Sequence, residues 1–120
     1  MKCAGTAKVA IIAEHWHVSD ATARNILNAA GLVPVNTGPI KYSWSDIWLL
    51  EGEVHVPPDL WKPYKAKLLK VPDLPVEDDE KRSERAWRRY VEKKRLPVIR
   101  LSDTITRVRR CVFEIAQHYV

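Results

Sequence analysis

The sequence predicts an α+β protein, mostly helical, that is built from two similar units in tandem. Three observations support this prediction: two Ser-led helical stretches 64 residues apart, a short alternating run after each stretch, and a segment rich in proline and aromatic residues between the copies. A chain of 120 residues has room for one domain or two very small ones. We therefore expect an N-terminal unit at 1–53, a stiff linker at 54–65 and a C-terminal unit at 66–120.

The repeat is clearest between residues 19–35 and residues 83–99. Each copy opens with a serine whose hydroxyl can accept a hydrogen bond from a free N–H of the first helical turn. An acidic residue follows each serine, where the helix dipole is positive. The apolar residues then recur at helical spacing: Ala23, Ile26, Leu27 and Ala30 in the first copy, Trp87, Tyr90 and Val91 in the second. We expect Gly31 to end the first helix and Pro97 to end the second.

A short hairpin is predicted after each Ser-led helix. In the first copy, residues 33–35 and 40–44 flank the turn-forming stretch NTGP, and the alternation places Ile40, Tyr42 and Trp44 on one face. In the second copy, residues 98–101 and 104–108 flank Ser102-Asp103. A closing helix follows each hairpin, at 45–52 with Ser45 as its cap and at 109–119.

A further helix is predicted ahead of each Ser-led helix. The stretch 6–16 carries a clear helical stripe, with Val9, Ile12 and Ala13 on one face. Its counterpart at 66–82 is broken by Pro72 and Pro75, so we expect a helix that is short, distorted or followed by an acidic loop at 77–80. In the linker between the copies, Leu60, Trp61 and Tyr64 are expected to pack between the units.

The run SERAWRRYVEKKRLPVIRLSDTITRVRR resembles excisionase and MerR-like winged helix-turn-helix domains. That family typically shows a Ser-led recognition helix, an Arg-rich middle, an aromatic residue, a Leu-Pro step and an Arg-aromatic wing strand. The resemblance covers 83–112 well and 6–50 more loosely, where Trp44-Ser45-Asp46-Ile47 is similar to the family's entry into its last helix. Two departures stand out: Arg95 replaces the usual glycine, and the second copy lacks that aspartate. The resemblance implies two tandem winged helix-turn-helix units.

The basic residues are concentrated in the second half of the chain. Residues 1–60 hold four Lys/Arg and six Asp/Glu, and residues 61–120 hold sixteen and nine, for a total net charge of +5. This asymmetry indicates a polyanionic partner. Helical spacing turns Arg85, Arg88 and Arg89 away from the apolar stripe, so they are candidates for base edges or phosphates. Other expected contacts are Lys93, Arg100, Arg107 and Arg109 around that helix, and Arg24, Asn25, Asn28 and Lys41 in the first copy.

Other kinds of site are not indicated. His15 and His17 fall on different helix faces, so we expect no metal site, and no residue pattern indicates catalysis or a cofactor. Two cysteines without a CxxC pattern argue against a disulfide framework. The apolar run at 7–13 is too short for a membrane span or a signal peptide, so we expect a cytoplasmic, nucleoid-associated protein without a membrane partner.

The sequence therefore leads us to expect a sequence-specific DNA-binding protein of bacterial, phage or plasmid type, either an excisionase or a transcriptional regulator. Its expected partner is double-stranded DNA, with self-association on DNA or an integrase as further partners. Two alternatives stay open: another DNA transaction factor, such as a small terminase subunit or a replication control protein, and a protein-interaction adaptor with winged-helix folds. The first copy is compatible with a DNA contact or with a protein contact.

Overall fold

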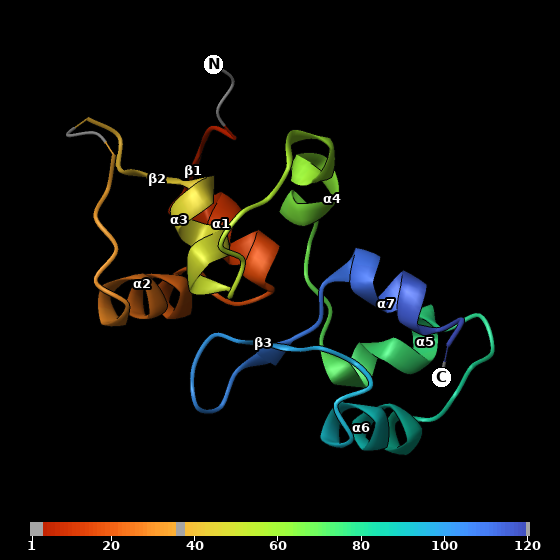
Figure 1. The fold of residues 1–120 in the computed structure, drawn as a ribbon. Helices are drawn as coiled ribbons and strands as arrows, with labels where there is room; N and C mark the ends of the chain where they lie inside the picture. The colour runs from red at the N-terminus through yellow and green to blue at the C-terminus, as the bar shows by residue number, and fades with distance from the viewer. Residues whose placement is uncertain (1–3, 36–37, 120) are drawn as a thin grey trace. The chain divides into compact units, whose positions relative to one another are not determined.

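The structure is a computed structural model that describes residues 4–35 and 38–119 (Figure 1). It is an α+β fold, about half helical, with seven α-helices and two small two-stranded antiparallel sheets in this described part. The chain divides into two compact units, Met1–Ala66 (unit 1) and Lys67–Val120 (unit 2). The longest described helix has ten residues, so none of the described helices is long enough to cross a bilayer.

Unit 1 begins with a strand and a pair of helices joined by a tight turn. Its elements are β1 (Thr6–Lys8), α1 (Val9–Trp16), α2 (Asp20–Ala29), β2 (Lys41–Ser43), α3 (Trp44–Leu50), the 3₁₀ turn η1 (Pro58–Leu60) and α4 (Trp61–Lys65). The predicted Ser19 cap is confirmed, because its hydroxyl accepts a hydrogen bond from the Thr22 N–H at 3.2 Å. The predicted stop at Gly31 is also confirmed, since its φ of 70° takes the backbone out of the helix.

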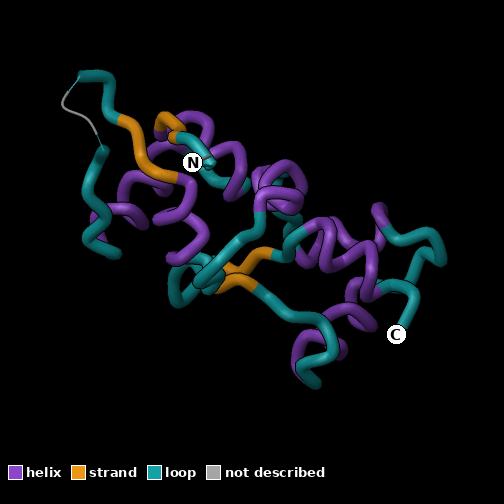
Figure 2. Tube along the Cα trace, turned by 45° about the horizontal axis from the view of Figure 1, so that its top comes forward, coloured by secondary structure: helices purple, strands orange, loops and turns teal. Residues whose placement is uncertain are grey.

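The hairpin predicted at 33–35 and 40–44 is wrong. Strand β2 pairs instead with β1, and Figure 2 shows both strands in orange. The pairing is antiparallel, with Ala7 opposite Tyr42. Residues 33–35 form no strand and keep a single backbone bond to this region, from the Val35 N–H to the Lys41 carbonyl at 2.9 Å. Pro34 has no N–H to give to a ladder, whereas β1 presents an unbroken backbone and a small buried residue, Ala7. The helix expected over 6–16 therefore starts only at Val9, and Asn36 and Thr37 of the expected turn lie outside the described residues.

The cap predicted for the following helix is displaced by two residues. Helix α3 begins at Trp44, and the Ser43 hydroxyl accepts from the Ser45 N–H at 3.2 Å, so Ser43 takes the capping role expected of Ser45. Of the predicted hairpin face, Trp44 and Tyr42 are buried but Ile40 is exposed. The alternation breaks because the chain turns from strand to helix between Ser43 and Trp44.

The segment expected to be a linker folds onto unit 1. The Trp48 indole N–H donates to the Tyr64 carbonyl at 3.1 Å, and the Trp61 indole N–H donates to the Val56 carbonyl at 2.9 Å. The last residues of this segment are held by His15, whose Nδ1–H donates to the Ala66 carbonyl at 2.8 Å. These bonds satisfy indole and imidazole donors that burial would otherwise leave without partners.

Unit 2 repeats the order of helix, turn and Ser-capped helix, and then adds a true hairpin. Its elements are the 3₁₀ turn η2 (Val71–Asp73), α5 (Leu74–Glu77), α6 (Glu84–Glu92), β3 (Ile99–Arg100), β4 (Thr106–Arg107) and α7 (Arg110–Ala116). The hairpin prediction is confirmed here, with Ile99 opposite Arg107. The expectation of a short helix before α6 is confirmed as well, since α5 has only four residues.

The core of unit 2 holds α6 against the hairpin and α7. Trp87 on α6 is fully buried and contacts the ring of Phe113 on α7, with ring centroids 5.1 Å apart. Tyr90 packs against this core, whose other buried members are Leu69, Leu74, Leu96, Val108 and Ala116. The predicted apolar stripe of α6 is therefore confirmed, and it fixes which side of the helix faces outwards.

The stop predicted at Pro97 is wrong. Helix α6 ends at Glu92, and Lys94 adopts a left-handed conformation with a φ of 58°. The Arg95 N–H then bonds back to the Tyr90 carbonyl at 2.8 Å, which closes the helix before the proline is reached. Lys94 thus does in the second copy what Gly31 does in the first, one residue earlier relative to the serine cap.

Candidate nucleic-acid interface

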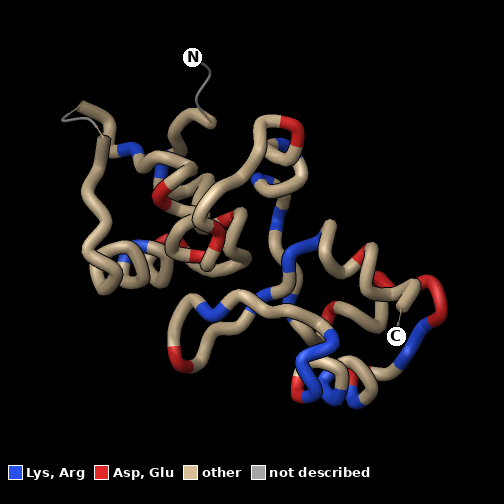
Figure 3. Tube along the Cα trace, viewed as in Figure 1, with Lys and Arg blue, Asp and Glu red and all other residues tan. Residues whose placement is uncertain are grey.

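The outer face of α6 carries the densest group of cations that the sequence predicted to be a site. Arg85, Arg88 and Arg89 are all exposed, while Trp87 between them is fully buried. Figure 3 shows Lys and Arg side by side along this helix and the chain that follows it. The apolar face of the helix packs against the core, so the arginines on the opposite face project into solvent without disturbing core packing.

The three arginines differ in what holds them. The Arg88 guanidinium donates from Nε and Nη2 to the same Glu84 oxygen, at 2.9 and 2.5 Å, one helical turn away. Such an exposed i,i+4 pair contributes only about 0.3–0.5 kcal/mol, but it limits the directions that Arg88 can take. Arg85 and Arg89 make no ion pair with any described residue. Their guanidinium groups are therefore open to an anionic ligand.

Further cations extend this face beyond the end of α6. Lys93, Lys94 and Arg95 are exposed where the helix closes, and Arg100 is exposed on β3. Arg107 on β4 is half-buried, and burial lowers the pKa of its guanidinium, an effect that the Asp73 carboxylate partly opposes. Its Nη1 donates to the Thr106 carbonyl at 2.8 Å, so part of this side chain is engaged within the unit.

Arg109 does not join this exposed group. Only 3% of the residue is exposed, and it precedes α7 as the N-cap residue. A guanidinium at this depth cannot reach a phosphate without leaving the fold, so we remove Arg109 from the expected contacts. The sequence pattern could not reveal this, because a basic residue between a strand and a helix has no periodic signature of burial.

The predicted contacts of unit 1 lie on two elements. Arg24, Asn25 and Asn28 are exposed on α2, and Lys41 is half-buried on β2 opposite Lys8. Arg24 and Asn28 border a hollow of about 470 Å³ to which Lys8 and Tyr42 also contribute. Sequence reasoning missed Lys8 and Tyr42 because it placed Lys8 in a helix and Tyr42 in a hairpin. The spacing of Arg24 and Asn28, one helical turn, was the available signal.

The two units differ in charge as well as in detail. With the observed boundary at residue 66, unit 1 holds six Lys/Arg and six Asp/Glu, a net charge of zero. Unit 2 holds fourteen Lys/Arg and nine Asp/Glu, a net charge of +5. The whole excess of positive charge therefore belongs to the unit that carries α6.

Comparison with protein-family models, with curated proteins and with solved structures finds no match for this chain. Across residues 4–35 and 38–119, no three His, Cys, Asp or Glu side chains are grouped as a metal ion would require. His15 is instead buried against Glu51, with Nε2 and Oε2 2.7 Å apart. The cationic surface of unit 2 is therefore the candidate functional site.

Proposed function

We propose that this protein binds double-stranded DNA through unit 2, with α6 in the major groove and the β3–β4 hairpin against the backbone. The observation that carries the proposal is the pair Arg85 and Arg89, which are exposed and make no ion pair among the described residues. They lie on a helix whose opposite face is anchored by Trp87. An α-helix fits the major groove, and the planar arginine fork can bond both acceptors of guanine or straddle a phosphate.

The remaining cations divide by position into base-reading and backbone roles. Arg85, Arg88 and Arg89 lie on the helix that would enter the groove, whereas Lys93 and Arg100 lie beyond its end. Cations at the border of a groove contact phosphates, which fix the register of a protein on DNA without reading its sequence. The net charge of +5 on unit 2 would add long-range attraction.

Within this class we propose the role of an excisionase or a transcriptional regulator of phage, plasmid or bacterial type. Both roles use the same DNA contacts and differ in the partner that is recruited. An excisionase would associate with itself on DNA or with an integrase, which a footprint covering several adjacent sites would reveal. A regulator would protect a single site.

The test is fluorescence anisotropy of the full chain with a duplex of about 30 base pairs, at several salt concentrations. Each phosphate contact contributes roughly 0.9 to the slope of log K against log salt, so we expect a slope of several. Replacing Arg85 and Arg89 together by Ala should lower affinity at least tenfold and reduce the slope by up to about 2.

The matched control replaces two other exposed cations, Lys62 and Lys67, by Ala. This control removes the same charge from outside α6 and should change the affinity much less. Absence of binding at low salt, or an equal loss in both double variants, would contradict the proposed function.

A further inference from the structure

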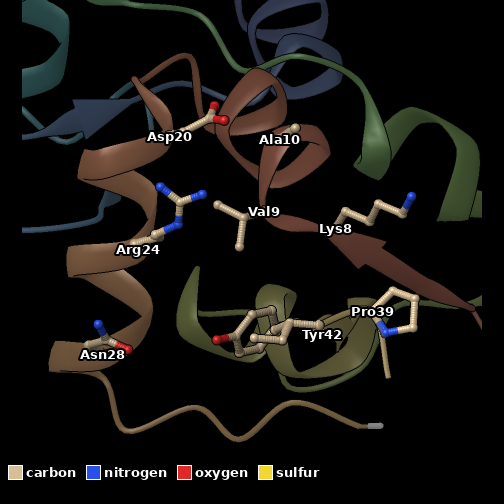
Figure 4. A pocket seen from close by; sticks show the side chains of 9 residues that line it. Lys8, Val9, Ala10, Asp20, Arg24, Asn28, Pro39 and Tyr42 are labelled. Atoms are coloured by element: carbon tan, nitrogen blue, oxygen red, sulfur yellow. The ribbon is translucent and has the colours of Figure 1, made fainter. Parts of the chain in front are cut away.

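Unit 1 contains a half-open hollow of about 470 Å³ between α2 and β2 (Figure 4). Asp20, Arg24 and Asn28 form one wall, because residues four apart lie in a single column on a helix. Tyr42 on β2 and Lys8 on β1 line the hollow from the sheet. Its volume lies within the roughly 300–1,000 Å³ range of small-molecule sites in proteins.

Three polar side chains around this hollow, those of Arg24, Asn28 and Tyr42, form no hydrogen bond with the described residues. Tyr42 is 7% exposed, and its hydroxyl points toward α2 (Figure 4). Within the described residues that hydroxyl makes no hydrogen bond, and the side chains of Arg24 and Asn28 make none either. The Tyr42 hydroxyl is not among the buried polar atoms that lack a partner, so it is open to the hollow and available to a ligand. A ligand that accepts from these donors would gain hydrogen bonds without displacing a partner among the described residues.

The charges around the hollow select the kind of anion. Lys8 and Arg24 contribute two positive charges and Asp20 one negative charge, which leaves a net charge of +1. A phosphodiester carries one negative charge, whereas a phosphate monoester carries about 1.5–2 at neutral pH. The nearby carboxylate disfavours the more highly charged anion, so the hollow matches a phosphate inside a strand better than a free nucleotide.

The rest of the lining fits the remainder of a nucleotide. Val9 and Ile40 give the hollow an apolar surface that can cover a sugar or a base. Asn28 lies one helical turn from Arg24, with about 5–6 Å between Cβ atoms, so one ligand can contact both side chains. The Asn amide can both donate to and accept from the edge of adenine.

We propose that this hollow binds one phosphodiester-linked nucleotide of single-stranded DNA, with the phosphate at Arg24 and the base edge at Asn28. The Tyr42 hydroxyl donates a hydrogen bond to the same nucleotide. Bases in a duplex are stacked and paired, so a nucleotide seated in this way comes from a single strand or an opened end. The site belongs to unit 1, whereas α6 belongs to unit 2.

The experiment titrates the full chain, labelled with ¹⁵N, with hexadeoxyadenylate and follows amide shifts at Lys8, Arg24, Asn28 and Tyr42. Three matched probes accompany it: an abasic hexamer of the same charge, deoxyadenosine monophosphate and inorganic phosphate. We expect saturable shifts with hexadeoxyadenylate, and affinities at least about fivefold weaker for the other probes. Equal affinity for the abasic hexamer or for inorganic phosphate would overturn the proposal, as would the absence of shifts at these amides. If deoxyadenosine monophosphate bound more tightly than hexadeoxyadenylate, the assignment of the hollow to a nucleotide within a strand would be wrong.

Two conservative variants test the assigned contacts. Tyr42→Phe removes only the hydroxyl, and Asn28→Ala removes only the exposed amide. Each variant should therefore lower the affinity for hexadeoxyadenylate at least about fivefold. Glu14→Gln is the control, because Glu14 is exposed on α1 and does not line the hollow. Unchanged affinity in both test variants would overturn the site. Duplex affinity measured in parallel reports on unit 2, so failure of one proposal is distinguishable from failure of the other.

Discussion

Asp78 is a fully buried carboxylate that holds together the turn before α6. Its oxygens accept hydrogen bonds from the backbone N–H of Glu80 at 3.0 Å and of Arg82 at 2.9 Å, and from the Arg82 guanidinium at 2.9 Å. That guanidinium also lies 5.6 Å above the ring of Trp87. Burial by itself would raise the pKa of Asp78, but the hydrogen bonds and the Arg82 charge outweigh burial and hold the pKa below its ordinary 3.8.

We predict that Asp78→Ala lowers the free energy of unfolding by about 2–4 kcal/mol, because two backbone N–H groups and a guanidinium lose their acceptor. The folded-state pKa lies below the unfolded value, so the carboxylate stabilises the fold above that value. Its contribution should disappear as the pH falls below 3.8 toward the folded pKa. Urea unfolding monitored by Trp fluorescence at several pH values measures both effects.

Asp79→Ala is the matched control for this prediction, since Asp79 is exposed and contacts Gln117 through its backbone only. It should change stability by less than about 0.5 kcal/mol. If the two variants were equally stable, or if Asp78→Ala kept the wild-type pH dependence, the role assigned to Asp78 would be wrong.

At the scale of elements, the closure of α6 depends on a residue poorly suited to its backbone conformation. Lys94 has a φ of 58°, which side chains other than Gly and Asn adopt at a cost. The equivalent closure of α2 uses Gly31, with a φ of 70°. Glycine at this position would end the helix with greater stability. Lysine instead places a cation beside the proposed DNA-binding face.

We predict that Lys94→Gly raises the free energy of unfolding by about 0.5–1 kcal/mol, because glycine enters the left-handed region without a steric cost. Lys93→Gly is the matched control: Lys93 has a φ of −83°, so glycine there adds only flexibility to the unfolded chain. The control should lower stability by about 0.5–1 kcal/mol. Chemical denaturation measures both changes in the free energy of unfolding. If the two changes had the same sign, the backbone conformations of Lys93 and Lys94 would not differ as described.

At the scale of the whole molecule, each unit has a buried polar or apolar centre of its own. In unit 1, His15 Nε2 and the Trp16 indole N–H both meet Oε2 of Glu51, at 2.7 and 2.9 Å. In unit 2 the core gathers around Trp87 and Phe113. Two separate centres predict that a lesion in one unit affects the stability of that unit first.

We predict that Glu51→Gln accelerates amide hydrogen exchange in unit 1 by tenfold or more and leaves the core amides of unit 2 unchanged. A Gln nitrogen in the place of Oε2 would face the Trp16 N–H. A Gln oxygen there would accept from Trp16, but a neutral amide would replace the carboxylate that faces His15 Nε2, so either placement costs about 1–3 kcal/mol.

The control for this experiment is Glu14→Gln on the exposed side of α1, which should not alter exchange in either unit. Mass spectrometry of the exchanged protein resolves the two units by their peptides. An equal acceleration in both units would show that the chain unfolds as one cooperative body and would contradict the division between them.

Local signals were sufficient where a few neighbouring residues decide the outcome. Ser19 and Ser83 cap their helices as predicted, Gly31 ends α2, and the stripe around Trp87 is buried. The β3–β4 hairpin was also predictable, because both strands and their turn are adjacent in the sequence. The exposure of Arg85 and Arg89, and so the candidate site on α6, follows from the same helical periodicity.

The sequence by itself determined the helices α2 and α6, their serine caps and the concentration of positive charge, because these depend on spacing and on residue type over one or two helical turns. The tertiary structure decided the rest. It paired β2 with β1 across more than thirty residues, buried Arg109 and brought Tyr42 opposite Arg24. Strand pairing and burial are set by competition among distant segments for the same backbone groups and the same core. A local sequence pattern therefore cannot predict which segment pairs or which residue is buried.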